Sequence, residues 1–381
     1  MNDSMIEDSA KRLFSEQVDK ALRLRAEAGE LDATLWRHVV ESGFPLLLAT
    51  EAAGGYGQGW TDAYPLLRGL GYWQVPLPLA ETMVAALLGS MAGFDLPDLA
   101  AGPLTLIEQG QGNQLQLGGT ADAPTLSGTA HAVPWARHAS AALVSLADGR
   151  LALLGLQGAA GAVGVTGVTG VRGVAGAAGA AGVMLQPQVN HAGLPSDTLV
   201  LQQARLQAVA PNPVALRQPV WTLGAVARSA MLVGALESAL EQAVRYAGER
   251  VQFGKPIGKN QAIQQNLALM AGDVAAARVA ALVAAADAPS TQYADSRAAP
   301  FSAAVAKVRA GEAATRGTGI VHQVHGAIGF THEHPLHFAT RRLWAWREEF
   351  GTDAMWAAEL GRAAIAARAA GFWPGLTAKQ F

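Results

Sequence analysis

The sequence predicts an α+β protein, with an N-terminal helical domain, a middle β-barrel or sandwich domain, and a C-terminal four-helix bundle. Three observations predict this order: helical spacing near the N-terminus, short alternating runs in the middle, and long apolar helical faces afterwards. The chain has 381 residues, more than the ~250–300 at which a single core stops growing. We therefore expect domains at 1–102, 103–206 and 207–381.

The first domain is expected to consist of helices and turns. The stretch LDATLWRHVVESGFPLLL places Leu35, Val39 and Val40 at helical spacing and ends its helix at Gly43. The glycine-rich sequence EAAGGYGQGW at 51–60 is typical of a loop, and helical patterns resume after it.

The middle domain has the signature of strands. LTLIEQG, QLQLGG, AALVSL and RLALLGL are short apolar or alternating runs separated by turn residues. Within this region glycine recurs at every third position from Gly155 to Gly182. Collagen has this period, but these triplets contain no proline. We expect a low-complexity loop or a poorly packed strand pair, and the alternative is an interaction protein that uses this glycine-triplet segment.

The third domain is strongly helical from Trp221 onward. Apolar residues at spacings of three and four predict helices over 233–243, 263–277, 305–324 and 353–370. Many of these positions are alanine, which lets helices approach closely and favours a four-helix bundle.

Composition excludes several classes of function. The formal net charge of −2 provides no excess of basic residues for nucleic-acid binding. Cysteine is absent, which excludes disulfides, thiolate metal sites and a cysteine nucleophile. The N-terminus lacks the apolar core of a signal peptide, and no run of 18 or more apolar residues predicts a membrane span. We expect a cytoplasmic protein.

The stretch YAGERVQFGKPIGKNQAIQ, at 246–264, predicts an exposed turn between two bundle helices. Gly254 and Pro256 end the first helix, and Asn260 caps the second. Arg250 offers a planar fork that matches phosphate oxygens, and Phe253 offers a stacking face. Taken alone, the stretch is equally compatible with a basic surface turn.

This stretch closely resembles the Arg-x-x-Phe-Gly-x-Pro-Ile…Gln-x-Ile-Gln motif of the acyl-CoA dehydrogenase family. QVHGAIGFTHEHPLH, at 323–337, resembles that family's second C-terminal signature, and LWRHVVESGF with EAAGGYGQG is similar to its weaker N-terminal one. The family's domains follow the same helical, β, helical order. The resemblance implies FAD bound at a tetramer interface and α,β-dehydrogenation of an acyl-CoA thioester. An electron-transfer flavoprotein is a candidate partner, and the sequence does not identify the electron acceptor.

The resemblance also assigns cofactor-binding residues by motif position. Arg250 and Phe253 would meet the pyrophosphate and adenine side of a neighbouring subunit's FAD, with Gln252 and Gln261 alongside. Contacts to the adenosine end would come from Gln323, Gly326 and Ala327, and Thr352 would lie near the flavin. Ala327 stands where the family usually has glycine.

A histidine cluster lies within and beside the second signature. His322, His325, His332, His334 and His337 would suit a metal by residue type, since imidazole is a common zinc ligand. No thiolate accompanies them and no pair has the helical i, i+4 spacing. The family resemblance covers the same positions, and we expect no metal site.

The family's catalytic carboxylate often directly precedes a Gly-Thr, but here Phe350 precedes Gly351. Glu349 is one residue early, and adjacent side chains diverge by about 100° on a helix. One hypothesis is a flavin-dependent dehydrogenase, a homotetramer or dimer, in which Glu349 is a displaced catalytic base. The other is a base-lacking subunit that pairs with a related dehydrogenase and lends it Arg250 and Phe253.

Two segments of the β domain also depart from the family pattern. The family's Thr-Glu-Pro-Gly-Ala-Gly-Ser motif, which touches the flavin, best matches IEQGQGN at 107–113. Its Trp-Ile-Thr beside the flavin ring is replaced near AVPWARH at 132–138, where Trp135 is shifted. These departures predict altered contacts to the flavin ring, whereas the adenosine-side motifs are retained.

Overall fold

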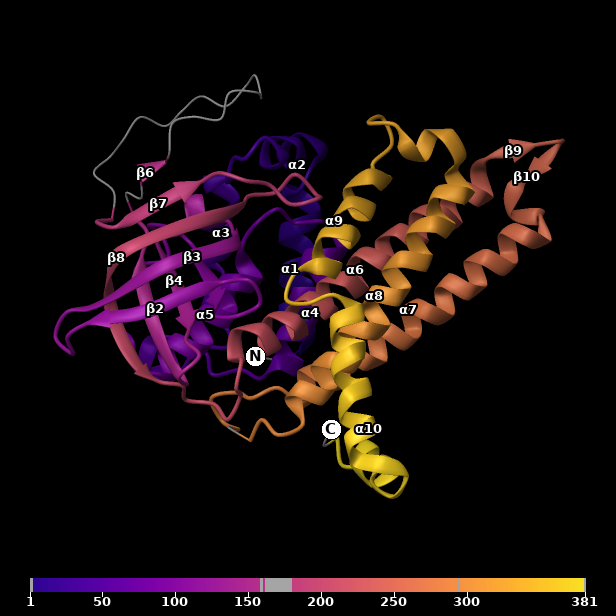
Figure 1. Ribbon diagram of the computed structural model, residues 1–381. Coiled ribbons are helices and arrows are strands. Elements are labelled where there is room, and N and C mark those ends of the chain that lie inside the picture. The colour runs from indigo at the N-terminus through magenta and orange to yellow at the C-terminus, as the bar shows by residue number, and fades with distance from the viewer. Residues whose placement is uncertain (1–2, 158–159, 162–179, 294, 380–381) are drawn as a thin grey trace.

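A computed structural model describes residues 3–157, 160–161, 180–293 and 295–379. Its elements follow the predicted order of N-terminal helices, a curled middle sheet and a C-terminal helical bundle (Figure 1). The predicted α+β fold class is confirmed. Most of the glycine-triplet segment, at 155–182, lies outside the described residues.

The N-terminal region contains the elements α1 (Asp3–Gln17), α2 (Lys20–Glu27), α3 (Ala33–Glu41), η1 (Phe44–Leu46), η2 (Glu51–Ala53), α4 (Trp60–Tyr72) and α5 (Leu79–Met91). Asp19 and Asp32 cap α2 and α3, because their carboxylates accept the N–H groups of Leu22 and Leu35 at 2.7 and 2.9 Å. Helix α5 is buried over nearly its whole length. It lies where the N-terminal region meets the sheet.

The middle region contains the strands β1 (Leu104–Glu108), β2 (Gln114–Gly119), β3 (Pro124–Pro134), β4 (Ala141–Ser145), β5 (Arg150–Gly155), β6 (Ala160–Gly161), β7 (Val183–Gln186) and β8 (Ser196–Pro211), with a short helix η3 (Ala136–His138). The sheet order is β1-β4-β5-β8-β3-β2, and β7 also pairs with β8. β1 and β4 run parallel, whereas β5 and β3 run antiparallel to β8. β8 curls the sheet because its first half pairs with β3 and its second half with β5.

The C-terminal region contains α6 (Pro219–Glu249), β9 (Val251–Gln252), β10 (Lys255–Pro256), η4 (Ile257–Lys259), α7 (Gln261–Asp287), α8 (Ala299–His325), η5 (Gly326–Phe330), α9 (Leu336–Glu348) and α10 (Asp353–Thr377). The predicted bundle corresponds to α6, α7, α8 and α10. α9 is not among the predicted helices, because charged residues interrupt its apolar pattern and one of them, Arg342, is buried. The bundle extends away from the sheet (Figure 1).

A continuous apolar core joins the N-terminal helices to the bundle, and a second cluster fills the sheet. Two glycines allow α4 and α6 to touch. A Cβ at Gly71 would lie 1.9 Å from the carbonyl oxygen of Met231, and one at Gly234 would lie 1.9 Å from that of Arg68. The backbones therefore approach more closely than any larger residue permits.

Two helices, α6 and α7, are long and apolar enough to cross a membrane by length and composition alone. The sequence does not predict either helix as a membrane span, because scattered polar residues interrupt both apolar runs. In the fold, 89% of the most apolar window of α6 is buried, and 28% of that of α7. Both helices pack within the bundle beside α8.

Candidate functional site

A tight hairpin joins α6 to α7 at the end of the bundle far from the sheet (Figure 1). β9 and β10 pair antiparallel, and between them Phe253 and Gly254 have left-handed backbones with φ of 50° and 78°. This is the geometry of a two-residue hairpin turn. Phe253 is fully exposed at its tip. Asn260 accepts the N–H of Ala262 at 3.1 Å and caps α7, as the sequence predicts.

Basic side chains surround this hairpin. Arg250, Lys255 and Lys259 are exposed, and within the described residues none of them forms an ion pair with a carboxylate. Gln252 and Gln261 are exposed beside them. One projection therefore carries the predicted cofactor-binding residues of the first motif, with its cations and amides available to an outside ligand.

The second signature lies at the same end of the bundle. Gln323, Gly326 and Ala327 are exposed where α8 ends and η5 begins. Gly326 has φ 61° and ψ −144°, a conformation that favours glycine. The rings of Tyr246 and His325 stack at 4.6 Å and so join the last turns of α6 and α8. The fold thus brings together the two motifs that the resemblance assigns to the adenosine end of the cofactor.

The five histidines form an aromatic cluster beside this signature. The ring centroids of His325 and His334 are 4.6 Å apart, and those of His332 and His337 are 5.3 Å apart. Burial lowers the pKa of His322, His325, His334 and His337. In the part of the chain that the structure describes, no three His, Asp or Glu side chains gather in a way that could hold a metal ion.

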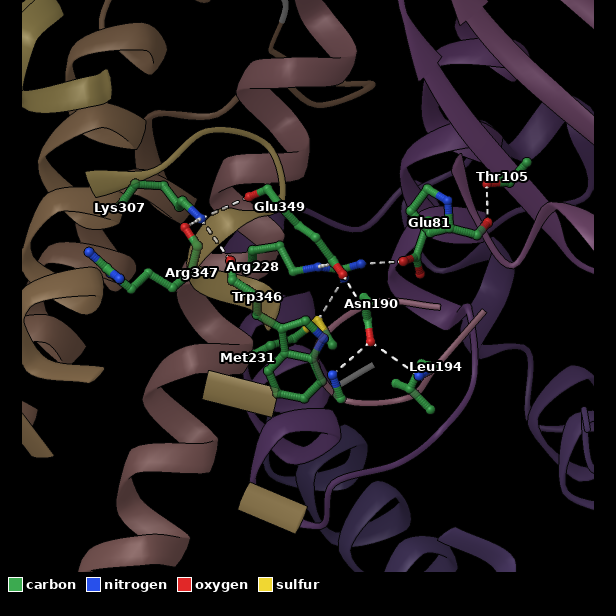
Figure 2. A network of polar contacts seen from close by, with 12 residues as sticks. Glu81, Thr105, Asn190, Leu194, Arg228, Met231, Lys307, Trp346, Arg347 and Glu349 are labelled. Carbon is green, nitrogen blue, oxygen red and sulfur yellow. Dashed lines mark hydrogen bonds and ion pairs between the residues drawn. The ribbon is translucent and has the colours of Figure 1, made fainter. Parts of the chain in front are cut away.

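A buried charge network lies where the three regions of the fold meet (Figure 2). The Arg228 guanidinium donates through Nε to Glu349 at 2.7 Å and through Nη2 to Glu81. Asn190 Nδ2 donates to the second oxygen of Glu349 at 2.8 Å. Burial lowers the pKa of Arg228, but the charges of Glu81 and Glu349 outweigh that effect and raise it overall. Both oxygens of the candidate base Glu349 are therefore engaged.

Lys307 holds the end of α9 beside this network. Its ammonium donates to the carbonyl oxygens of Trp346, Arg347 and Glu349 at 2.9, 3.1 and 2.8 Å. A cation at a helix C-terminus is favoured by the partial negative charge of the unpaired carbonyls. Burial lowers the pKa of Lys307 to about 7. The backbone of Glu349 is thus fixed as firmly as its carboxylate.

The turn after α9 sends adjacent side chains to different surroundings. Phe350 has φ 54° and packs against Gly224 on α6, where an added Cβ would lie 2.4 Å from the ring. Gly351 has φ 93°, and the Trp356 indole donates to the carbonyl oxygen of Phe350 at 2.9 Å. Thr352 caps α10 through its side chain. The position that the resemblance assigns to the base is occupied by an aromatic ring that packs against α6.

The remaining glutamate of this stretch lies at the surface. Half of the Glu348 side chain is exposed, and its Oε2 lies 3.1 Å from Nε2 of His191. Glu348 and Glu349 therefore differ in burial and in partners although they are neighbours in sequence.

The loop that matches the family's flavin-contacting motif uses its polar side chains to hold its own strands. Asn113 donates to the carbonyl oxygen of Glu108 at 2.9 Å and accepts from the N–H of His131 at 2.7 Å. Gln109 donates to the carbonyl oxygen of Leu115 at 2.7 Å. The amide groups of Asn113 and Gln109 are therefore already committed to backbone partners.

Glu108 begins this loop and caps α6. Its carboxylate accepts the N–H of Trp221 at 2.9 Å, in the first turn of that helix. Burial raises the pKa of Glu108 to about 7. The side chain lies beside a cavity of about 620 Å³ lined also by Arg217 and Gln218.

Trp135 is buried between the sheet and the bundle. It has a left-handed backbone with φ 55°, and its N–H donates to the carbonyl oxygen of Pro195 at 3.0 Å. Trp135, Arg228 and Glu349 line one cavity, whose volume is about 10 Å³. A single water needs roughly 10–15 Å³. The cavity beside Glu349 therefore has room for no more than about one water molecule.

Four members of the network are not among the residues predicted from the sequence: Glu81, Asn190, Arg228 and Lys307. A signal was present for three of them, because Glu81, Arg228 and Lys307 are isolated charges within apolar helical stretches. Such residues are almost never fully buried unless they are paired. Asn190 lies in a polar loop, and nothing in its sequence context distinguishes it.

Comparisons with known proteins agree with this architecture. The family model described as "Acyl-CoA dehydrogenase, C-terminal domain" matches residues 221–365. The chain is 30% identical over 328 residues to "Acyl-CoA dehydrogenase FadE27" of Mycobacterium tuberculosis, covering 80% of this chain and 81% of that relative.

Two solved structures share the whole fold. A variant of the "Tcur3481-Tcur3483 steroid ACAD" matches with a TM-score of 0.78 and 25% identity, covering 96% of this chain and 98% of that one. The "ChsE4-ChsE5 complex from Mycobacterium tuberculosis" matches with a TM-score of 0.76 and 24% identity, covering 96% and 97%. These structures share the fold, and the similarity to FadE27 over most of both chains shows that this chain belongs to the acyl-CoA dehydrogenase family.

Proposed function

We propose that this chain is the base-lacking, FAD-contacting subunit of a heteromeric acyl-CoA dehydrogenase. One observation carries the proposal: the carboxylate of Glu349 is bound by Arg228 and Asn190 in a space of about 10 Å³. A general base must reach the proton it removes, within hydrogen-bond distance of the substrate. Phe350, at the usual base position, offers no carboxylate.

The residues of this chain fit FAD at the hairpin end of the bundle. Arg250 presents an exposed guanidinium whose fork matches phosphate oxygens, and Phe253 presents an exposed ring for stacking. Gln323 and the exposed backbone at Gly326 and Ala327 add polar contacts. When bound, FAD supplies the acceptor for the hydride from the β-carbon of the substrate.

In this proposal the partner subunit supplies the carboxylate that removes the α-proton. This chain binds and orients the cofactor from outside the partner's active site: Arg250 neutralises phosphate charge, and Phe253 packs against the adenine side. The hairpin points away from the chain's own sheet, which fits a cofactor held by a neighbouring subunit (Figure 1).

The pairing is supported by two structural relatives, the Tcur3481-Tcur3483 steroid ACAD and the ChsE4-ChsE5 complex, each named for two different chains. The first is a steroid acyl-CoA dehydrogenase, so a bulky acyl-CoA belongs in the substrate panel. An electron-transfer flavoprotein as acceptor and a cytoplasmic location are part of the same proposal.

The competing function is a homomeric dehydrogenase in which Glu349 is the base. It requires the carboxylate to leave both Arg228 and Asn190 and the surrounding space to open. The Glu349→Gln substitution distinguishes the two functions. If Glu349 is the general base, its loss lowers turnover by ~10²–10⁴.

The experiment is to co-express the chain with a related dehydrogenase subunit and to measure bound FAD and flavin bleaching by straight-chain and steroid acyl-CoAs. We expect one FAD per pair of subunits, and turnover of the Glu349→Gln complex within about threefold of wild type, far from the loss expected for a base. Glu348→Gln is the matched control. A homomer that holds one FAD per chain, is bleached by acyl-CoA and loses activity in Glu349→Gln would overturn the proposal.

A further inference from the structure

We propose that Arg228 is a positioning residue that clamps the three regions of the fold together and keeps the space between them shut. Its guanidinium reaches Glu81 on α5 and Glu349 on the α9–α10 turn. Figure 2 shows these side chains converging from separate elements on one buried cation. Arg228 itself lies on α6 and is 3% exposed.

The sheet joins the clamp through Asn190, which lies between β7 and β8. Its Nδ2 donates to Glu349 at 2.8 Å, and its Oδ1 accepts the N–H groups of Ala192 and Leu194 at 2.9 and 3.1 Å. The amide is therefore fixed in orientation and ties the loop to the carboxylate. The N-terminal helices, the sheet and the bundle are linked through one guanidinium and one carboxylate.

Only arginine satisfies all the contacts at this position. Nε binds Glu349, Nη2 binds Glu81, and Nη1 lies 3.1 Å from the sulfur of Met231. The rigid fork serves partners on different sides at once, whereas a lysine ammonium is a single point charge. The guanidinium carbon also lies 5.4 Å from the Phe350 ring centroid, so the cation packs on the residue at the usual base position.

The clamp explains why so little room is left between the regions. Opening the cavity of about 10 Å³ would separate Arg228 from one of its two carboxylates and leave its buried charge only partly paired. The closed arrangement is therefore the resting form of this chain. A further consequence rests on the proposed function. Because the clamp keeps the space between the regions of this chain closed, the two subunits use the cofactor that is held with the partner subunit.

The test compares matched variants of the full chain by hydrogen-exchange mass spectrometry and by urea unfolding. In Arg228→Lys and Glu349→Gln, we expect exchange at 188–195 and in α5 to rise about tenfold or more, as for loss of a charge-assisted hydrogen bond. We expect Arg228→Lys to split the unfolding transition into separate steps for the sheet and the helices.

Two controls match these variants in residue type. Arg137→Lys weakens a buried pair with Asp197 that lies wholly within the sheet region, where Nε and Oδ1 are 3.0 Å apart. Glu348→Gln removes the neighbouring exposed carboxylate. We expect one unfolding transition in both controls and unchanged exchange in α5.

The two possible failures are distinguishable. If Arg228→Lys and Glu349→Gln leave exchange in α5 and at 188–195 unchanged, or keep a single transition as Arg137→Lys does, the clamp is wrong while the proposed function stands. If the purified pair holds one FAD per chain, the proposed function falls, whereas the exchange and unfolding results still decide the clamp.

Discussion

Arg228 and Glu349 form a largely buried ion pair with an Nε–Oε2 distance of 2.7 Å, in which 3% and 15% of the two side chains are exposed, although 121 residues separate them in sequence. The pair lies between regions that are helical on one side and β on the other. A carboxylate in this position stabilises a cation, and a carboxylate free to accept a proton from substrate would leave that cation with Glu81 as its one remaining carboxylate in the network. Breaking one partner of such a pair typically costs about 3–5 kcal/mol.

The lowered pKa of Lys307 predicts that the free energy of unfolding rises above neutral pH. Burial lowers its pKa to about 7 from 10.5, so between these values the unfolded chain binds a proton that the folded chain has released. The free energy of unfolding should therefore increase with pH from about 7 to 10.5, by up to about 1.4 kcal/mol per pH unit from this group.

Urea unfolding across that range checks this prediction. Lys307→Met should flatten the curve relative to wild type, whereas Lys255→Met, at an exposed hairpin position, should keep the wild-type slope. If the free energy of unfolding rises equally with pH in wild type and in Lys307→Met, the lowered pKa of Lys307 is contradicted.

Glu108 predicts the opposite dependence at lower pH. Burial raises its pKa to about 7 from 4.5, so the folded chain binds the extra proton between these values. The contribution is fully present below about 4.5 and is lost as the pH rises through 7. Glu108→Gln, which mimics the neutral form, should lose this dependence in unfolding measurements from pH 4.5 to 7, and Glu359→Gln on the exposed face of α10 should retain it.

The affinity of the subunit pair for FAD should depend on Arg250. Hydrogen bonds to charged groups contribute about 1.5–3 kcal/mol, so Arg250→Ala should weaken FAD binding by the subunit pair about 10- to 100-fold. Fluorescence titration of the flavin measures this change, and size-exclusion chromatography shows whether the pair remains assembled. Arg362→Ala, on an exposed surface of α10, serves as the control, and an equal loss in that variant would argue for nonspecific charge.

The turn beside the charge network should be sensitive to substitution of Gly351. Its φ is 93°, and a Cβ there would lie 2.5 Å from Nε1 of Trp356. Gly351→Ala should lower the free energy of unfolding by at least about 1–2 kcal/mol, since a left-handed backbone alone carries that cost. Thermal unfolding measures this change. The control is Gly361→Ala in helix α10, where an added Cβ meets nothing within 4 Å, and it should be neutral or stabilising in the same experiment.

The sequence predicts the fold well because helical and strand periodicities are local properties. The faces around Leu236 and Met270 become buried surfaces of α6 and α7, and the Asn260 cap forms as expected. The curl of β8 between two partner strands was not predictable in this way, because pairing depends on contacts between residues far apart in sequence.

The candidate site was predicted only in part. The motifs place Arg250 and Phe253 on one exposed hairpin, since a short turn holds them together whatever the rest of the chain does. The network around Glu349 could not be derived, because Glu81, Asn190 and Arg228 reach it from three separate regions. The sequence alone makes Glu349 a candidate base, whereas the structure shows which cation and which amide its carboxylate binds.

The long sequence separation within the network bears on how the chain is made. During synthesis, Arg228 emerges long after Glu81 but well before Glu349, so the growing polypeptide carries this cation with only half of its anionic partners. The helices and the sheet cannot lock together until the final turns leave the ribosome. A nascent chain shorter than this lacks the second carboxylate and leaves the surfaces between the regions exposed, the condition in which aggregation competes with folding.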